Sequence, residues 1–338
     1  MLATELHFLV KFGVTERGAV ANRTLALEGA HRGWWPFAYT LLADLEDDFT
    51  SGDDPLLERL YRSMRGGDHV QKITHRNRFA ALDEWLLNDL ERRFGHERPI
   101  AIHDMAASNG ITSLELFMRL AQRANVAVHC SDLHDAIYLV FPNGSRWKTI
   151  FDPDGRPLQY VGCGLVLSGY RPESLRYPVN RAVQIWADRC VLQRAANLLK
   201  AANFRHDQDA VQLSDGTVRR IKLVHPECVR LARSEPRFTV GRDDLFSPKP
   251  GQFNIIRIMN ALTAHHFEVE RVLEGIFRCA ANLVEGGMFI VGRSVDQENG
   301  CLRATAFVRR QSSLIPCRDF SEGYELKHLV RDIKLKAA

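Results

Sequence analysis

The sequence has no paired cysteines, no long apolar run and no strong excess of one charge. Its seven cysteines are odd in number and none stands in a C-x-x-C pair, which argues against a zinc ribbon or a disulfide framework. No apolar stretch approaches the roughly 20 residues of a transmembrane helix. The net charge of +4 is small for 338 residues, so nucleic acid is a poor candidate partner. The start also lacks the basic opening of a signal peptide, and we expect a cytoplasmic protein without a metal site.

Residues 1–98 are expected to be mainly helical, as a lid or a dimerisation region. Asp53 and Asp54 followed by a proline predict one helix start, and apolar residues over 79–94 recur at helical spacing. A homodimer is compatible with such a region.

Basic residues crowd the segment 59–78, in which Asp68 is the one acid. Such a run is either a solvated helix face or the mouth of an anion-binding site. On the second interpretation Arg76 and Arg78 are candidate substrate-binding residues, and the substrate would be acidic.

From residue 99 the pattern changes to alternating strands and helices. Residues 99–104 and 126–132 are expected strands on either side of a helix over 110–124, which makes a parallel, right-handed βαβ unit. The alternation resumes near 221. There we expect strands at 237–240, 253–259 and 286–292, helices at 225–233 and 269–284, and further strands at 304–308 and 324–330.

Residues 133–220 interrupt this alternation and are expected to form an inserted cap. An Asn143-Gly144 turn between β-rich runs predicts a hairpin, and a helix is expected over 180–199. Tyr138, Arg146 and Trp147 of this insertion could line the substrate site, although ordinary packing of the meander explains each of them as well.

The fold class is therefore α/β: a doubly wound, Rossmann-like, mostly parallel sheet with antiparallel edge strands. The expected core comprises residues 99–132 and 221–338, with the helical region 1–98 before it and the cap 133–220 inserted into it.

In such a sheet, ligands bind beyond the carboxyl ends of the strands, and the turn after the first strand matters most. Here this turn runs from His103 to Gly110 and contains the small residues Ala106 and Ser108, which would let a ligand approach the backbone. Small residues also serve close packing of a helix on a strand, so this signal is weak by itself.

Acidic residues follow the next two expected strands. Asp132 ends the second strand, where a carboxylate can accept both hydroxyls of a ribose. Asp243 and Asp244 follow the third, where one of them could accept from an adenine amino group while Leu245 or Phe246 packs on the ring.

These features together resemble the class I S-adenosylmethionine-dependent methyltransferases. The resemblance covers about 99–132 and 221–310, and its most specific part is the turn into a strand over 283–291. It implies that S-adenosylmethionine is the cofactor and that the segment from Asp104 to Gly110 binds its methionine part. It also implies a ribose at Asp132, adenine at Asp243 or Asp244, and Asn260 beside the methyl group.

The chain departs from the family where Ala106 and Ser108 replace glycines. A similar loop and an Arg-x-x-Asn-x-Leu-like segment at 257–262 occur in the chemotaxis-receptor methyltransferases. The paired glutamates that follow the glycine in those enzymes are Ile111 and Thr112 here, so the architecture is similar but the substrate is not carried over.

The favoured function is methyl transfer to an oxygen or nitrogen of a small metabolite, including an acidic one, with His265 or His266 as the base. Both histidines could instead be ordinary loop residues. The alternatives are a protein carboxyl methyltransferase of the chemotaxis-receptor type and an inactive regulatory protein that binds the cofactor. An NAD(P) dehydrogenase would prefer a G-x-G-x-x-G turn, which is absent.

Overall fold

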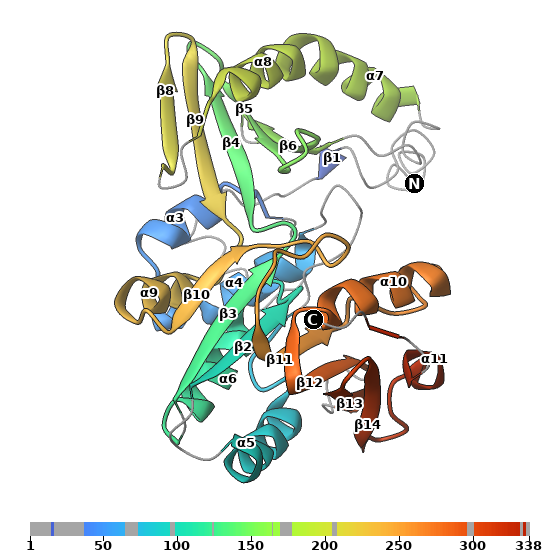
Figure 1. Ribbon diagram of the computed structural model, residues 1–338. Helices are drawn as coiled ribbons and strands as arrows, with labels where there is room; N and C mark the ends of the chain where they lie inside the picture. Colours follow the sequence, from blue (N-terminus) through green and yellow to red (C-terminus); the bar gives the residue numbers. More distant parts are fainter. Residues whose placement is uncertain are drawn as a thin grey trace, which may run out of the picture. The chain divides into compact units, whose positions relative to one another are not determined.

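The computed structural model divides the chain into two compact units, which we describe one at a time (Figure 1). Unit 1 consists of Met1–Ile73 and Ala136–Pro226, and unit 2 of Thr74–Asp135 and Glu227–Ala338. The residues that the structure describes are 15–16, 37–64, 74–94, 99–123, 125–163, 165–169, 178–204, 208–295, 301–331 and 334–335.

Unit 2 is built on a seven-stranded sheet. Its strands, in chain order, are β2 (Ile100–Met105), β3 (Val126–Asp132), β10 (Phe238–Arg242), β11 (Phe253–Met259), β12 (Leu283–Ser294), β13 (Leu302–Arg310) and β14 (Ser313–Phe320). Their spatial order is β10-β3-β2-β11-β12-β13-β14. The first five pair in parallel, and β13 and β14 are added antiparallel.

The strand order reverses at β2, because the chain moves outward from β2 to β3 and β10 and then returns to β11 on the other side of β2. In doubly wound sheets this switch point is where ligands bind, beyond the carboxyl ends of the strands. The register of β11 with β2 pairs Arg257 with Asp104 and Ile258 with Met105, so both strands end at the same edge.

Helices cover both faces of this sheet (Figure 1). They are α5 (Ala80–Phe94), α6 (Ile111–Leu120), α9 (Pro226–Ser234), α10 (Val269–Ala280) and α11 (Lys327–Arg331). Alternate residues of the buried strands face opposite layers. Ile256 and Ile258 of β11 share a core with Ile276 of α10, whereas Arg257 between them contacts Asp83 of α5 on the other face.

Unit 1 contains a second, wholly antiparallel seven-stranded sheet in the order β1-β7-β6-β5-β4-β9-β8. Its strands are β1 (Thr15–Glu16), β4 (Ala136–Pro142), β5 (Trp147–Phe151), β6 (Pro157–Gly162), β7 (Leu165–Ser168), β8 (Ala210–Leu213) and β9 (Gly216–Lys222). Its helices are α3 (Leu41–Asp47), η2 (Ser51–Asp53), α4 (Asp54–Ser63), α7 (Pro178–Ala187), the π-helical η4 (Asp188–Leu192) and α8 (Gln193–Ala201).

Both faces of this sheet are covered. Ile137 and Leu139 of β4 join the core of α3 and α4, whereas Val140, on the opposite face, packs with Leu198 of α8. Unit 1 therefore has three layers, with helices from the N-terminal segment on one side and from the later segment on the other.

The doubly wound, mostly parallel sheet with antiparallel edge strands is confirmed by unit 2. The expected strands 126–132 and 253–259 have the predicted bounds. The helical region expected over 1–98 contributes α3 and α4 to unit 1 and α5 to unit 2. The hairpin of β8 and β9 was not expected, and the helix expected over 180–199 contains a π-helical turn.

The strand expected over 324–330 is wrong, because that segment contains the start of α11. The edge strand is Ser313–Phe320 instead. Its central residues are mostly exposed and include Pro316, so it lacks the apolar alternation by which a strand is recognised.

Candidate functional site

The loop that follows β2 has an unusual backbone. Ala106, Ser108 and Gly110 have φ angles of 54°, 60° and 79°, all in the left-handed region. Glycine adopts this conformation freely, but alanine and serine do so at a cost unless the surrounding structure holds them. Backbone of this kind is concentrated at ligand sites, and here it lies at the switch point of the sheet.

Backbone and carboxylate groups of β3 hold this loop. The N–H of Ala107 donates to Ser131 O (3.0 Å), and the N–H of Ser108 donates to Asp132 Oδ2 (2.8 Å). Asp132 Oδ1 also accepts from the N–H of His134 at 3.0 Å. The half-buried Asp132 therefore joins the ends of the first two strands at the edge where a ligand is expected.

Asp104 lies beneath the loop and is already paired. Both of its carboxylate oxygens accept from the fully buried guanidinium of Arg257, at 2.8 and 2.6 Å, and Arg257 also donates to Asp83 Oδ1 at 2.7 Å. Burial alone would lower the pKa of Arg257, but the two carboxylates raise it above its ordinary value. Burial raises the pKa of Asp83 to about 7.

The two acids after β10 have different surroundings. Asp243 is buried, and its Oδ1 accepts from the N–H groups of Asp244 (2.9 Å) and Lys249 (3.0 Å), so it shapes the turn. Its Oδ2 lies 3.7 Å from His103 Nε2. Burial lowers the pKa of His103 to about 3, so that imidazole is neutral and this contact is not an ion pair. Asp244 is half-buried, and its Oδ1 accepts from the N–H of Phe246 at 2.9 Å.

The apolar residues of the same turn pack against α10. Leu245 and Phe246 border the core that includes Ile276. The Phe246 ring lies 5.1 Å from that of Phe267, and the Arg271 guanidinium is 3.8 Å from its centroid. A planar, partly apolar surface thus lies beside Asp244.

The end of β11 carries Asn260, a further residue with left-handed backbone (φ 63°). Its Oδ1 accepts from the N–H of Ser294 at 2.8 Å, and the hydroxyl of Ser294 accepts from Arg78 Nε at 3.0 Å. Asn260 and Arg78 therefore meet at Ser294. Arg76 instead pairs with Glu227, with 2.9 Å between Nη2 and Oε2.

The two histidines expected to act as a base lie in the segment after β11. His265 and His266 are both exposed, and their rings lie 5.2 Å apart. Thr263 of the same segment, which sequence reasoning missed, is 2% exposed. A lone threonine in a loop carries no sequence signal that separates it from ordinary packing.

Tyr138, Arg146 and Trp147 belong to unit 1. The Tyr138 ring packs 5.3 Å from Phe204, the Trp147 ring lies 5.1 Å from Trp186, and Arg146 is exposed. The two aromatic residues therefore have packing partners within unit 1, and a role for these three residues in substrate binding stays a prediction.

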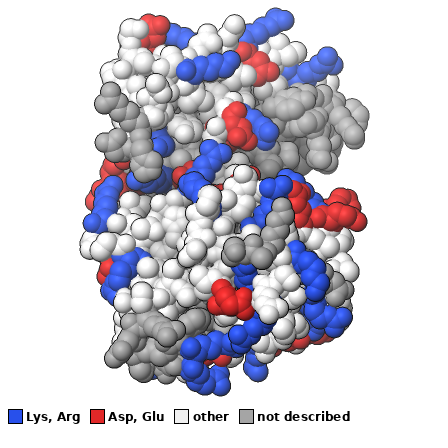
Figure 2. All heavy atoms as spheres, in the orientation of Figure 1, with Lys and Arg blue, Asp and Glu red and all other residues white. Residues whose placement is uncertain are grey.

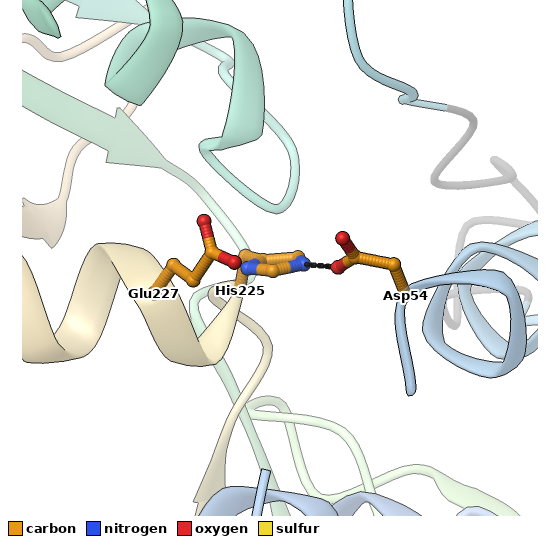
Figure 3. Close-up of side chains that lie close together, drawn as sticks. All are labelled: Asp54, His225 and Glu227. Atoms are coloured by element: carbon orange, nitrogen blue, oxygen red, sulfur yellow. Dashed lines mark hydrogen bonds and ion pairs between the residues drawn. The ribbon is translucent and has the colours of Figure 1, made fainter. Parts of the chain in front are cut away.

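Figure 3 shows three further side chains, two of which pair within unit 1. His225 Nε2 lies 3.1 Å from Asp54 Oδ1, and the imidazole meets the Phe49 ring edge-on at 5.3 Å. Glu227 belongs to unit 2, where it pairs with Arg76. Each of the three therefore has a partner within its own unit.

The buried polar atoms of unit 2 without a hydrogen-bond partner among the described residues include Ser108 Oγ and Thr263 Oγ1, from the loops after β2 and β11. Buried polar groups in native proteins are nearly always satisfied, so orphaned atoms at one edge fit a site that takes a polar ligand.

Comparison with known proteins gives only distant likenesses. No family model and no curated protein matches the chain. Among solved structures, the sugar N-methyltransferase KedS8 from Streptoalloteichus sp ATCC 53650 is 12% identical over 69% of this chain and 60% of its own, with a TM-score of 0.28. An O-methyltransferase family protein from Burkholderia thailandensis is 10% identical over 77% of this chain and 46% of its own, with a TM-score of 0.28. The amino pentose methyltransferase CalS10 from Micromonospora echinaspora is 10% identical over 69% of this chain and 65% of its own, with a TM-score of 0.28. The match thus spans less than two thirds of each of these proteins, and likenesses at this level carry no argument about activity.

The surface adds two observations. Acidic and basic side chains are interspersed over the face drawn in Figure 2. Among the helices in the described part of the chain, none is both long and apolar enough to cross a membrane.

Proposed function

We propose that unit 2 binds S-adenosylmethionine and transfers its methyl group to an oxygen or nitrogen of a small metabolite. The observation that carries the proposal is the strained loop after β2, held by the carboxylate of Asp132 at the switch point of a doubly wound sheet. This combination suits a ligand with a ribose and a polar tail that lies against exposed backbone.

The residues at this edge can be assigned to the parts of the cofactor. The loop with Ser108 and Gly110 would hold the methionine part, and Asp132 the ribose hydroxyls. Asp244 is the better candidate for the adenine amino group, because it is half-buried, whereas Asp243 is buried with its Oδ1 in its own turn and its Oδ2 near His103. Phe246 offers a surface on which the adenine ring can pack.

Asp104 is assigned a supporting position and not a contact with the ligand, since Arg257 and Ser113 occupy its carboxylate oxygens. The loop lacks the three glycines by which a dinucleotide's pyrophosphate would approach the backbone. This argues against NAD(P) as the bound nucleoside.

The cofactor, when bound, supplies a methyl group on a positively charged sulfur. The chain's own residues have to orient the acceptor and take its proton. Asn260 lies at the end of β11, where it can orient the acceptor, and the exposed His265 or His266 would take the proton at an imidazole nitrogen. Arg78 beside Ser294 supports an acidic substrate.

Isothermal titration calorimetry tests the proposal first. The chain should bind S-adenosylmethionine and S-adenosylhomocysteine but not NAD or NADP. Asp132→Asn should weaken binding about 10- to 100-fold, since a hydrogen bond to a charged group contributes roughly 1.5–3 kcal/mol. Asp135→Asn, three residues further along and also half-buried, is the matched control and should bind like the wild type.

Binding of NAD or NADP alone, or equal affinities for the two variants, would overturn the assignment. A methyl-donor assay against pools of metabolites and peptides then separates the alternatives. Cofactor binding without any transfer would indicate a regulatory protein, and methylation of peptide carboxylates would indicate the protein methyltransferase. A cytoplasmic location and a homodimer stay predictions.

A further inference from the structure

Arg257 is the largest of the fully buried side chains in the described part of the chain. It lies in β11, and its guanidinium contacts three other elements of unit 2. It donates to both oxygens of Asp104 at the end of β2, to Asp83 of α5, and to the carbonyl of Thr112 in the first turn of α6 (3.2 Å from Nη2). One side chain therefore links four segments.

Two of those contacts flank the strained loop. Asp104 precedes Met105 and the loop, and Thr112 follows Gly110 by two residues. Ser113 reinforces the same connection, because its hydroxyl donates to Asp104 Oδ2 at 2.5 Å. Both ends of the loop are thus attached to one guanidinium.

The loop needs this support for a physical reason. Ala106 and Ser108 have left-handed backbone, which non-glycine residues keep only where the surroundings impose it. A guanidinium is a rigid, planar fork that can bond two carboxylates and a carbonyl at once, and a lysine ammonium lacks that geometry.

We propose that Arg257 is a positioning residue for cofactor binding, which acts through Asp104 and Thr112 to hold the Ala106–Gly110 loop in its ligand-binding conformation. The identity of the ligand rests on the proposed function. The effect on the loop does not.

The test compares Arg257→Lys with Arg309→Lys. Arg309 is a second buried arginine of unit 2, 3% exposed, which donates to the carbonyls of Ala281 (3.2 Å) and Leu283, where β12 begins. Both changes remove a buried guanidinium from the same unit, but only Arg257 touches residues that flank the loop. Both variants are expected to lose stability.

Hydrogen exchange of the loop amides is the first readout, and it needs no ligand. In Arg257→Lys the amides of Ala107 and Ser108 should exchange about tenfold faster than the change in global stability alone predicts. The reason is that their hydrogen bonds to β3 should open more often. In Arg309→Lys the exchange rates of these two amides should change only as far as the change in global stability requires. The second readout is the dissociation constant of S-adenosylhomocysteine, which should rise about tenfold for the folded Arg257→Lys and stay within twofold for Arg309→Lys.

Equal exchange of the loop in the two variants would overturn the proposal and leave Arg257 as a residue of the core alone. Should Arg257→Lys not fold, Ser113→Ala removes one hydrogen bond to Asp104 and should act in the same direction, about threefold in exchange. Unchanged exchange in Ser113→Ala would then refute the proposal. If the loop responds as expected but the wild type binds no S-adenosyl compound, the proposed function fails and the positioning role stands.

Discussion

Replacing Arg257 by methionine would leave two buried carboxylates without their cation. The side chains of Asp83 and Asp104 are 2% and 4% exposed, so neither can be solvated where it lies. Removing one partner of a buried ion pair typically costs about 3–5 kcal/mol, because the charge left behind has neither water nor a partner. We therefore expect Arg257→Met to lose about 4 kcal/mol of stability.

The loss should also depend on pH. Burial raises the pKa of Asp83 to about 7, and the positive charge of Arg257 acts in the opposite direction. Without Arg257 the pKa of Asp83 rises further, so above pH 7 the folded variant keeps a proton that the folded wild type has released and continues to lose stability. The loss should therefore be about 1 kcal/mol larger at pH 8 than at pH 6.

Urea unfolding followed by circular dichroism at pH 6 and pH 8 measures both values. With a slope of about 2 kcal/mol/M, the midpoint of Arg257→Met should fall by about 2 M at pH 6 and by about 0.5 M more at pH 8. Arg278→Met, which breaks an exposed pair with Glu274 on α10, is the control and should leave the midpoint unchanged. An equal loss at both pH values would refute the effect of Arg257 on the pKa of Asp83.

Three further substitutions test single contacts. Asp83→Asn should gain stability relative to the wild type as the pH rises from about 4 to 7, because the raised pKa of Asp83 makes the wild type lose stability over that range. If urea titrations show the same change in unfolding free energy with pH for both proteins, this prediction is wrong. Asn260→Gly removes the acceptor for the N–H of Ser294 but relieves the left-handed backbone. Thermal unfolding should therefore show a net loss of about 1 kcal/mol of stability. Asn260→Asp should retain the hydrogen bond. Tyr324→Phe leaves the carbonyl of Leu262 without its buried donor and should cost about 1–2 kcal/mol, and an unchanged melting temperature would show that this bond contributes nothing.

Elements with strong local patterns could be predicted from the sequence. The run from Phe253 to Met259 is apolar except for Asn254 and Arg257, and it has the predicted bounds. The placement of Asp132 at the end of β3 followed from the same reasoning, and its contact with Ser108 shows that the first two strand ends do meet.

Pairings between distant segments could not be predicted. Arg257 and Asp83 are separated by 174 residues, and no local periodicity shows that α5 packs beside β11. For the same reason Asp104 was assigned to the ligand by resemblance, whereas the structure shows it paired with Arg257. The φ angles of Ala106 and Ser108 were also hidden, because their residue types give no indication of left-handed backbone.

The second segment of unit 1 interrupts unit 2 in the chain, and this has a consequence for synthesis. β3 ends at Asp132, but its parallel neighbour β10 begins only at Phe238, after all of the second segment of unit 1. During translation, β2, α6 and β3 leave the ribosome well before β10 and β11, which flank them in the finished sheet. The nascent βαβ unit must therefore wait with two open strand edges while the second segment of unit 1 is made, and open edges pair readily with other chains. Folding of unit 2 should for this reason be slow and should depend on chaperones.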